Sequence, residues 1–163
     1  MKVNKHFFGA VLFLLAIALV GCKNDFKPEE SYIKVYDHND MNRTFFPISI
    51  KGTSDNGYMI LSAYNNSGIH LLKTNETGDM LWEYDLPSQY NNAVPNLIER
   101  NGDLFFVCMD AVGLFAYVMQ IDEAAQNASE LQVFPDLLYT LYVADNESSV
   151  FIQNYERQTL ETG

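Results

Sequence analysis

The sequence predicts an all-β fold built from a repeated antiparallel unit. Three turn-forming segments, centred on Asn56, Asn101 and Asn146, follow one another at intervals of 45 residues. Short runs rich in β-branched and aromatic residues flank each of them, which is typical of strands joined by tight turns. A repeat of this length is one supersecondary unit that buries its faces by stacking on its neighbours. We therefore expect successive, similarly built sheets.

The turns themselves favour hairpins. Asn56-Gly57 and Asn101-Gly102 offer residues that accept the positive φ of a two-residue β-hairpin, and Asn146 takes the corresponding place in the third unit. We expect all three turns to occupy equivalent positions in their sheets.

Four strands are expected in each complete unit of about 45 residues, which is the length of one β-propeller blade. An additional strand is expected over Tyr32–Tyr36, ahead of the repeat. The units lie near residues 46–90, 91–135 and 136–163, and the third stops after its hairpin. Their strands are predicted, position by position, at Ile48–Lys51, Asn96–Glu99 and Leu138–Tyr142; Tyr58–Tyr64, Leu104–Met109 and Ser149–Tyr155; Gly68–Lys73 and Phe115–Gln120; and Met80–Leu86 and Glu130–Phe134.

The apolar pattern of Leu104–Met109 predicts burial on both faces of that strand. Phe105 and Val107 share one face, and Phe106 and Cys108 share the other. A strand that is apolar on both sides is typical of a sheet packed between two others.

Part of the first unit resembles one repeat of a bacterial β-propeller family. The family pattern runs Asp-Gly-Gly-Tyr, an apolar strand, Leu-x-Lys-Thr-Asp and Gly-Asn-x-x-Trp. The matching segments here are Asp55–Leu61, Ile69–Thr74 and Gly78–Trp82, with Asn56 in place of a glycine and Asn75 in place of the aspartate. The later units keep neither the Leu-Lys-Thr segment nor the tryptophan. The resemblance covers roughly residues 46–155.

Thr77–Trp82 also resembles the tryptophan-docking repeat of quinoprotein-like propellers. Both resemblances imply a propeller-like array of four-stranded antiparallel units, with Trp82 as a structural core residue. Closed propellers usually have four to eight blades, and this chain provides about two and a half. We expect an incomplete, amino-terminal portion of a propeller; the alternative is a small domain of stacked sheets.

The first residues predict export. Lys2 and Lys5 precede an apolar run, Phe7–Val20, that is well short of the roughly 20 residues needed to span a bilayer. The run ends in Leu19-Val20-Gly21-Cys22, which resembles a bacterial lipobox. That resemblance implies a signal peptide over residues 1–21, lipid on Cys22, and anchoring to the cell envelope, with the outer membrane the expected location.

Residues 22–32 are the lipidated cysteine and a polar tether. Lys23-Asn24-Asp25 resembles the export tags of surface lipoproteins in Bacteroidetes-type bacteria, which implies exposure at the cell surface. Removal of the leader takes the chain from 163 to 142 residues and, with Lys2 and Lys5 gone, the net charge from −11 to −13. So negative a field repels phosphate backbones, so we expect no nucleic-acid partner.

Few residues carry recognisable chemistry. With Cys22 lipidated, Cys108 has no disulfide partner, and its apolar neighbours predict a buried hydrophobe and not a nucleophile. His38 lies in a polar turn and His70 within a strand, and neither belongs to a metal-binding pattern. No nucleophile elbow, zinc helix or phosphate loop occurs, so we expect no metal, no cofactor and no catalytic residue in this chain.

The leading functional prediction is a membrane-anchored lipoprotein whose propeller-type surface binds a protein or glycan without catalysis. Two alternatives stay open. In the first, the chain is the amino-terminal part of a propeller enzyme that acts on polysaccharide. In the second, it is the amino-terminal part of a scaffold for outer-membrane protein assembly.

Overall fold

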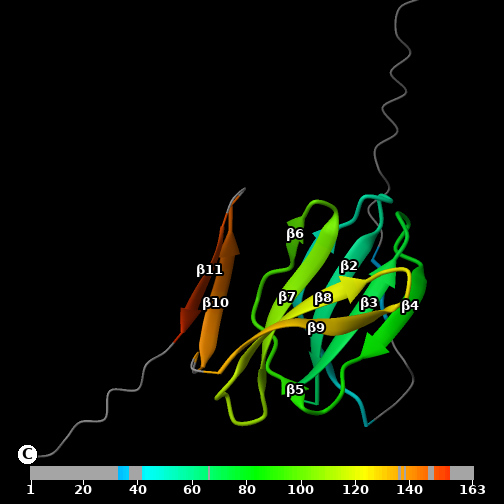
Figure 1. Ribbon diagram of the computed structural model, residues 1–163. Helices are drawn as coiled ribbons and strands as arrows, with labels where there is room; N and C mark the ends of the chain where they lie inside the picture. Colours follow the sequence, from blue (N-terminus) through cyan, green and yellow to red (C-terminus); the bar gives the residue numbers. More distant parts are fainter. Residues whose placement is uncertain are drawn as a thin grey trace, which may run out of the picture. The chain divides into compact units, whose positions relative to one another are not determined.

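The computed structural model describes residues 33–36, 42–65, 67–135, 137, 139–146 and 149–154 (Figure 1). Within them the chain is all-β, with eleven strands, antiparallel pairing throughout and no helix. No helix able to cross a membrane therefore occurs in this described part. The amino-terminal unit Met1–Val35 is separate from the unit that begins at Tyr36. The predicted signal peptide, Cys22, the tether and His38 lie outside the described residues.

The first sheet is a simple meander of four strands. It contains β1 (Phe45–Gly52), β2 (Tyr58–Tyr64), β3 (Gly68–Thr74) and β4 (Met80–Asp85), hydrogen-bonded in that order. All four strands were expected here, and β2 lies between two neighbours as predicted. Residues 33–36 are not a strand, however, so the prediction of an earlier strand is wrong over those residues.

The second sheet has five strands and is curled (Figure 1). Its main path is β5-β7-β8-β9, and β6 also pairs with β7. A two-residue strand, β5, was not expected, because a strand this short has no periodicity to read. The strands are β5 (Tyr90–Asn91), β6 (Ile98–Arg100), β7 (Asp103–Asp110), β8 (Ala116–Asp122) and β9 (Asn127–Phe134).

The third sheet is a hairpin of β10 (Thr140–Asp145) and β11 (Val150–Asn154). In each sheet the asparagine turn joins two antiparallel strands: β1 and β2, β6 and β7, and β10 and β11. The turns differ in length. Only Asn101-Gly102 forms a two-residue turn, between the paired residues Arg100 and Asp103; in the first sheet the pair that closes the hairpin is Gly52 and Tyr58, so the loop has five residues.

Two apolar clusters join the three sheets. The first lies between the first and second sheets and includes Leu61 and Leu71 from one and Phe106 and Cys108 from the other. The second cluster joins Val107 on β7 to Val143 and the half-buried Ile152 of the hairpin, with Phe105 packed against it. The predicted division of β7 between two buried faces is therefore confirmed.

Polar contacts reinforce the same stacking. The backbone N–H of Leu97 donates to Oγ of Ser49, 3.2 Å away, between the first two sheets. Nδ2 of Asn96 donates to the carbonyl oxygen of Val143 at 3.2 Å, and the Arg100 guanidinium donates to that of Asn146 at 3.3 Å. The second sheet is thus held on both sides.

Candidate functional site

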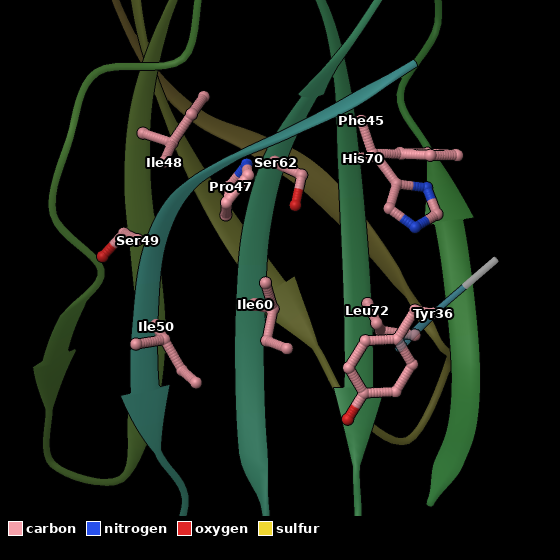
Figure 2. A pocket seen from close by; sticks show the side chains of 10 residues that line it. All are labelled: Tyr36, Phe45, Pro47, Ile48, Ser49, Ile50, Ile60, Ser62, His70 and Leu72. Atoms are coloured by element: carbon pink, nitrogen blue, oxygen red, sulfur yellow. The ribbon is translucent and has the colours of Figure 1, made fainter. Parts of the chain in front are cut away.

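The face of the first sheet that points away from the second sheet carries a groove of about 470 Å³ (Figure 2). Its floor comes from two cross-strand pairs of β2 and β3, Ile60 with Leu72 and Ser62 with His70. Because side chains alternate along a strand, these four lie opposite the apolar cluster that holds Leu61 and Leu71. The remaining lining residues are Tyr36, Phe45, Pro47, Ile48, Ser49 and Ile50.

Residues outside the sheet floor shield this face from water. His70, Leu72 and Ser62 are only 2%, 4% and 6% exposed. The ring of Phe45 lies 4.7 Å from the imidazole, centroid to centroid, and the hydroxyl of Tyr36 donates to the carbonyl oxygen of Gly78 at 2.7 Å. Aromatic rings thus border the groove, and its size falls in the range of about 300–1,000 Å³ that is typical of small-ligand sites.

A cluster of charged side chains contacts His70, one of the residues that line the groove. Nδ1 of His70 lies 2.8 Å from Oδ1 of Asp85, and Nη2 of Arg43 donates to the other carboxylate oxygen at 2.5 Å. Glu83 places Oε2 3.8 Å from Nε2 of the same imidazole. The carboxylate of Asp85 thereby fixes the orientation of the His70 ring, as in any carboxylate–imidazole pair.

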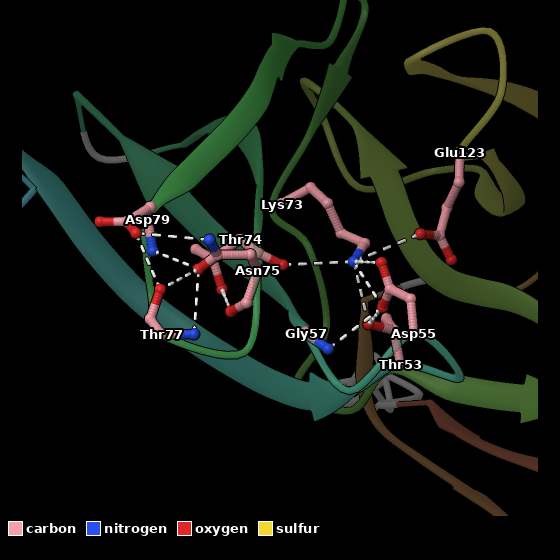
Figure 3. Close-up of polar contacts among 9 residues, drawn as sticks. All are labelled: Thr53, Asp55, Gly57, Lys73, Thr74, Asn75, Thr77, Asp79 and Glu123. Carbon is pink, nitrogen blue, oxygen red and sulfur yellow. Dashed lines mark hydrogen bonds and ion pairs between the residues drawn. The ribbon is translucent and has the colours of Figure 1, made fainter.

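A second polar centre surrounds Lys73, which is 1% exposed (Figure 3). Its ammonium donates to both oxygens of Asp55 at 2.8 and 2.7 Å and to Oγ1 of Thr53 at 3.0 Å, both in the loop after β1. It also donates to the carbonyl oxygen of Thr74 at 3.2 Å. A buried ammonium requires such partners, because burial without them costs several kcal/mol.

This cluster also reaches the second sheet. Oε2 of Glu123, in the turn after β8, lies 3.6 Å from Nζ of Lys73. Hydrogen bonds from Lys73 and then Thr53 hold the pKa of Asp55 well below its ordinary value, with a smaller contribution from the backbone N–H of Gly57. The Asp55 carboxylate therefore stays ionised at a lower pH than an ordinary aspartate.

Gly57 is required here by space. A Cβ at this position would stand 2.1 Å from the carbonyl oxygen of Thr74 and 2.8 Å from Nζ of Lys73. The glycine of the family-like Asp-Asn-Gly segment therefore lets the loop close over the lysine. Asn56, beside it, takes the positive φ of 64°.

The loop between β3 and β4 is closed by its own side chains (Figure 3). Oδ1 of Asn75 accepts hydrogen bonds from the backbone N–H groups of Thr77, at 3.0 Å, and Asp79, at 2.7 Å. Oγ1 of Thr77 lies 2.8 Å from that oxygen and 2.8 Å from Oδ2 of Asp79, so its single O–H can donate to either acceptor. An asparagine thus meets the acceptor requirement of this turn.

The other predicted site residues have structural positions. Asn101 and Gly102 take φ values of 53° and 88° in the two-residue turn, and Oδ1 of Asn146 accepts from the backbone N–H of Ser149 at 2.8 Å. Trp82 is half-buried and packs against the cluster between the first two sheets. Burial raises the pKa of the Cys108 thiol to about 12, which is incompatible with a reactive thiolate at neutral pH.

Neither the groove nor the lysine cluster was predicted from the sequence. The groove needs Tyr36, Phe45 and the floor pairs of β2 and β3 to meet in space, and Lys73 looks like an ordinary exposed lysine. One signal was available: Lys73 shares a strand face with Ile69 and Leu71, which is unusual for a lysine on an exposed face. Within the described residues no cluster of three His, Cys, Asp or Glu side chains fits a metal ion.

A scan against protein-family models found no match to this chain, and a search of curated proteins found none either. The groove and the lysine cluster are therefore interpreted from their own geometry.

Proposed function

We propose that this chain is a lipid-anchored cell-envelope lipoprotein whose stacked β-sheets present a non-catalytic binding surface of the propeller type. The observation that carries the proposal is the stacking itself. The first sheet packs on the second through one apolar cluster, and the second packs on the third through the other. Each sheet also has an asparagine turn between two antiparallel strands. Radially stacked blades are built in this way.

The chemistry of the groove supports binding over turnover. Most of its wall is aliphatic or aromatic, and its most buried polar ring, that of His70, is oriented by Asp85 at one side. Ligand sites commonly combine such an apolar wall with a small number of polar groups that set orientation. The buried ammonium of Lys73 is committed to Asp55 and to the loop around it.

Anchoring is tested by metabolic labelling with a fatty acid. Wild-type protein should carry label and sediment with membranes, whereas Cys22→Ser should carry none and should appear in the soluble fraction or as an uncleaved precursor. Cys108→Ser is the matched control, because that thiol is buried and should not affect labelling. A labelled, membrane-bound Cys22→Ser variant would exclude the lipoprotein.

Binding is tested with glycan arrays and with envelope proteins cross-linked in intact cells. A protein or glycan ligand should be retained by wild type and released by Ile60→Asp, which places a charge on the groove floor while leaving the apolar cluster on the other face of β2 intact. Leu131→Asp, on an exposed position of β9, is the control. Turnover of a polysaccharide, or capture of outer-membrane proteins during assembly, would instead support one of the two alternative functions.

A further inference from the structure

We propose that Asn101 is a site of spontaneous deamidation in the folded protein, whereas Asn56, which is also followed by glycine, is protected from the same reaction. The inference goes beyond the binding function proposed above and depends on neither the groove nor the lipid anchor. It rests on a comparison within the molecule. The two Asn-Gly pairs stand 45 residues apart, in the turns between β1 and β2 and between β6 and β7, and their surroundings differ.

The reaction joins an asparagine side chain to the backbone of the next residue. The backbone nitrogen of that residue attacks Cγ of the asparagine to form a cyclic succinimide, and its proton leaves with the side-chain nitrogen as ammonia. Water then opens the ring at either carbonyl and leaves aspartate or isoaspartate, so that water is consumed and ammonia is released overall. A following glycine favours the attack, because it has no Cβ to hinder the approach of its nitrogen.

The first turn holds its glycine in place. Gly57 is buried, and its backbone N–H donates to Oδ1 of Asp55 at 3.1 Å (Figure 3). Backbone hydrogen bonds close the turn further: the N–H of Asn56 donates to the carbonyl oxygen of Thr53 at 3.0 Å, and the N–H of Thr53 donates to that of Gly57 at 2.9 Å. Ring closure at Asn56 must turn the Gly57 nitrogen towards Cγ, and this movement breaks its bond to the carboxylate that pairs with the buried Lys73.

The second turn leaves the same two groups in open surroundings. Asn101 and Gly102 are both exposed, and they complete the turn alone, between the paired residues Arg100 and Asp103. A Cβ built on Gly102 would meet open space. The side chain of Asn101 borders a hollow of about 440 Å³, which gives it room to rotate. The movement that ring closure requires is therefore unobstructed here.

Backbone conformation does not separate the two sites. Asn56 and Asn101 take similar φ values of 64° and 53°, so ring closure at either one begins in the left-handed region and requires a rotation of the backbone. At the first site that rotation gives up a hydrogen bond to a charged acceptor. Such a bond is strong enough that folding should slow the reaction of Asn56 roughly tenfold or more relative to that of Asn101.

Deamidation would change the contact between the second and third sheets. The Arg100 guanidinium, from the residue before the reacting asparagine, donates to the carbonyl oxygen of Asn146 at 3.3 Å. Isoaspartate lengthens the backbone of this two-residue turn, and either product adds a carboxylate to a hollow that Glu99 and Asp145 already line. Like charges at short range repel one another. The modified chain should therefore hold the β10–β11 hairpin less firmly.

Hydrogen exchange measures this loosening. The deamidated and unmodified chains can be separated by anion exchange, because deamidation adds a negative charge. Backbone amides of Val150–Asn154 should exchange faster in the deamidated fraction, while those of β2 and β3 in the first sheet should exchange at the same rate in both. Equal exchange of the hairpin amides in the two fractions would contradict an effect of the modification on the third sheet.

A variant tests the cause of the protection. Asp55→Ala removes the acceptor of the Gly57 N–H and should raise the rate of deamidation at Asn56, with the rate at Asn101 unchanged. Circular dichroism should show that the variant keeps its strand content. An unchanged rate at Asn56 in the folded variant would contradict the protection inferred from this hydrogen bond.

The deciding experiment incubates the detergent-solubilised full chain at neutral pH and follows both sites by peptide mapping and mass spectrometry. The chain unfolded in guanidinium chloride, at the same pH and temperature, is the matched control, because it corrects for the residues that flank each asparagine. Relative to this control, folding should slow Asn56 roughly tenfold or more beyond any slowing of Asn101. Equal slowing at both sites, or a folded chain in which Asn56 reacts faster than Asn101, would overturn the proposal.

Discussion

The hairpins of the first two sheets place chemically different side chains at equivalent buried positions. Met59 on β2 and Leu104 on β7 stand 45 residues apart, and both lie in the cluster between the sheets. Across the next strand, however, Met59 is paired with Lys73, and Leu104 is paired with Ile121. The first sheet therefore buries a cation where the second buries an aliphatic side chain.

The turn explains this difference. In the first hairpin a five-residue loop brings Asp55 and Thr53 over the Lys73 ammonium. In the second, the two residues Asn101 and Gly102 complete the turn, and no loop side chain is required. A repeat can thus keep its backbone plan while the chemistry at one buried position changes together with the length of the neighbouring turn.

The largest expected effect is in the core that both sheets share. Leu61 and Phe106 are also 45 residues apart and are both 0% exposed. Phe106→Ala should lower the free energy of unfolding by about 3–5 kcal/mol, because it removes a buried ring and leaves a cavity. Urea unfolding followed by the fluorescence of Trp82, the one tryptophan of the sequence, measures it. Phe151→Ala, on the exposed hairpin face, should cost far less, and similar losses would contradict this core.

Substitutions of Asp55 and of Lys73 should lower the free energy of unfolding by different amounts. Asp55→Ala leaves the buried ammonium of Lys73 without its carboxylate and should cost about 2–3 kcal/mol. Lys73→Met should cost only about 1 kcal/mol, since the thioether chain fills the same space and Asp55, 52% exposed, returns to water. The same unfolding assay applies. If Lys73→Met lowered the free energy of unfolding more than Asp55→Ala, the hydrogen bonds of the ammonium would stabilise the fold beyond the pairing of its own buried charge.

Substitution of Gly57 and substitution of Gly102 should destabilise the fold for different physical reasons. Gly57→Ala must displace the backbone carbonyl of Thr74 and should cost about 1–3 kcal/mol. At Gly102 there is open space, but the φ of 88° strains any L-residue, so Gly102→Ala should cost about 1 kcal/mol. Gly102→Asn should recover part of that loss, because asparagine tolerates positive φ, whereas Gly57→Asn should not. Equal behaviour at both positions would show that crowding does not determine the first turn.

The smallest expected effect is the contribution of the ionised Asp55 carboxylate to the free energy of unfolding, which acid should remove. The folded-state pKa of Asp55 is lowered from 3.8, so its stabilising effect is complete above that value and declines as pH falls towards the lowered pKa. The stability difference between wild type and Asp55→Asn, about 1 kcal/mol at pH 7 after solvent screening, should shrink steadily below pH 3.8. Urea unfolding at pH 7, 4 and about 2.5 tests this. A difference that grows in acid would have the wrong sign.

Local patterns in the sequence were sufficient to place ten of the eleven strands of the described residues. Alternation of apolar side chains and the regular spacing of Asn56, Asn101 and Asn146 depend only on neighbouring residues, and these features predicted the all-β class and the two buried faces of β7. The short strand β5 and the lengths of the first and third turns were missed, because each depends on contacts from other strands. The expected strand at residues 33–36 failed for a related reason: Tyr36 instead borders the groove.

The sequence by itself determined the all-β class, the turn residues and the net charge, since all three follow from local propensity and composition. Only the tertiary structure decided that Lys73 is buried and paired with Asp55. The same holds for Ser62 and His70, which are buried on an outer face, with the ring of Phe45 beside His70. The physical reason is distance along the chain. Lys73 meets its partner 18 residues away, and Tyr36 meets Gly78 across 42 residues, and no local pattern specifies which distant groups satisfy a buried charge or cover an apolar face.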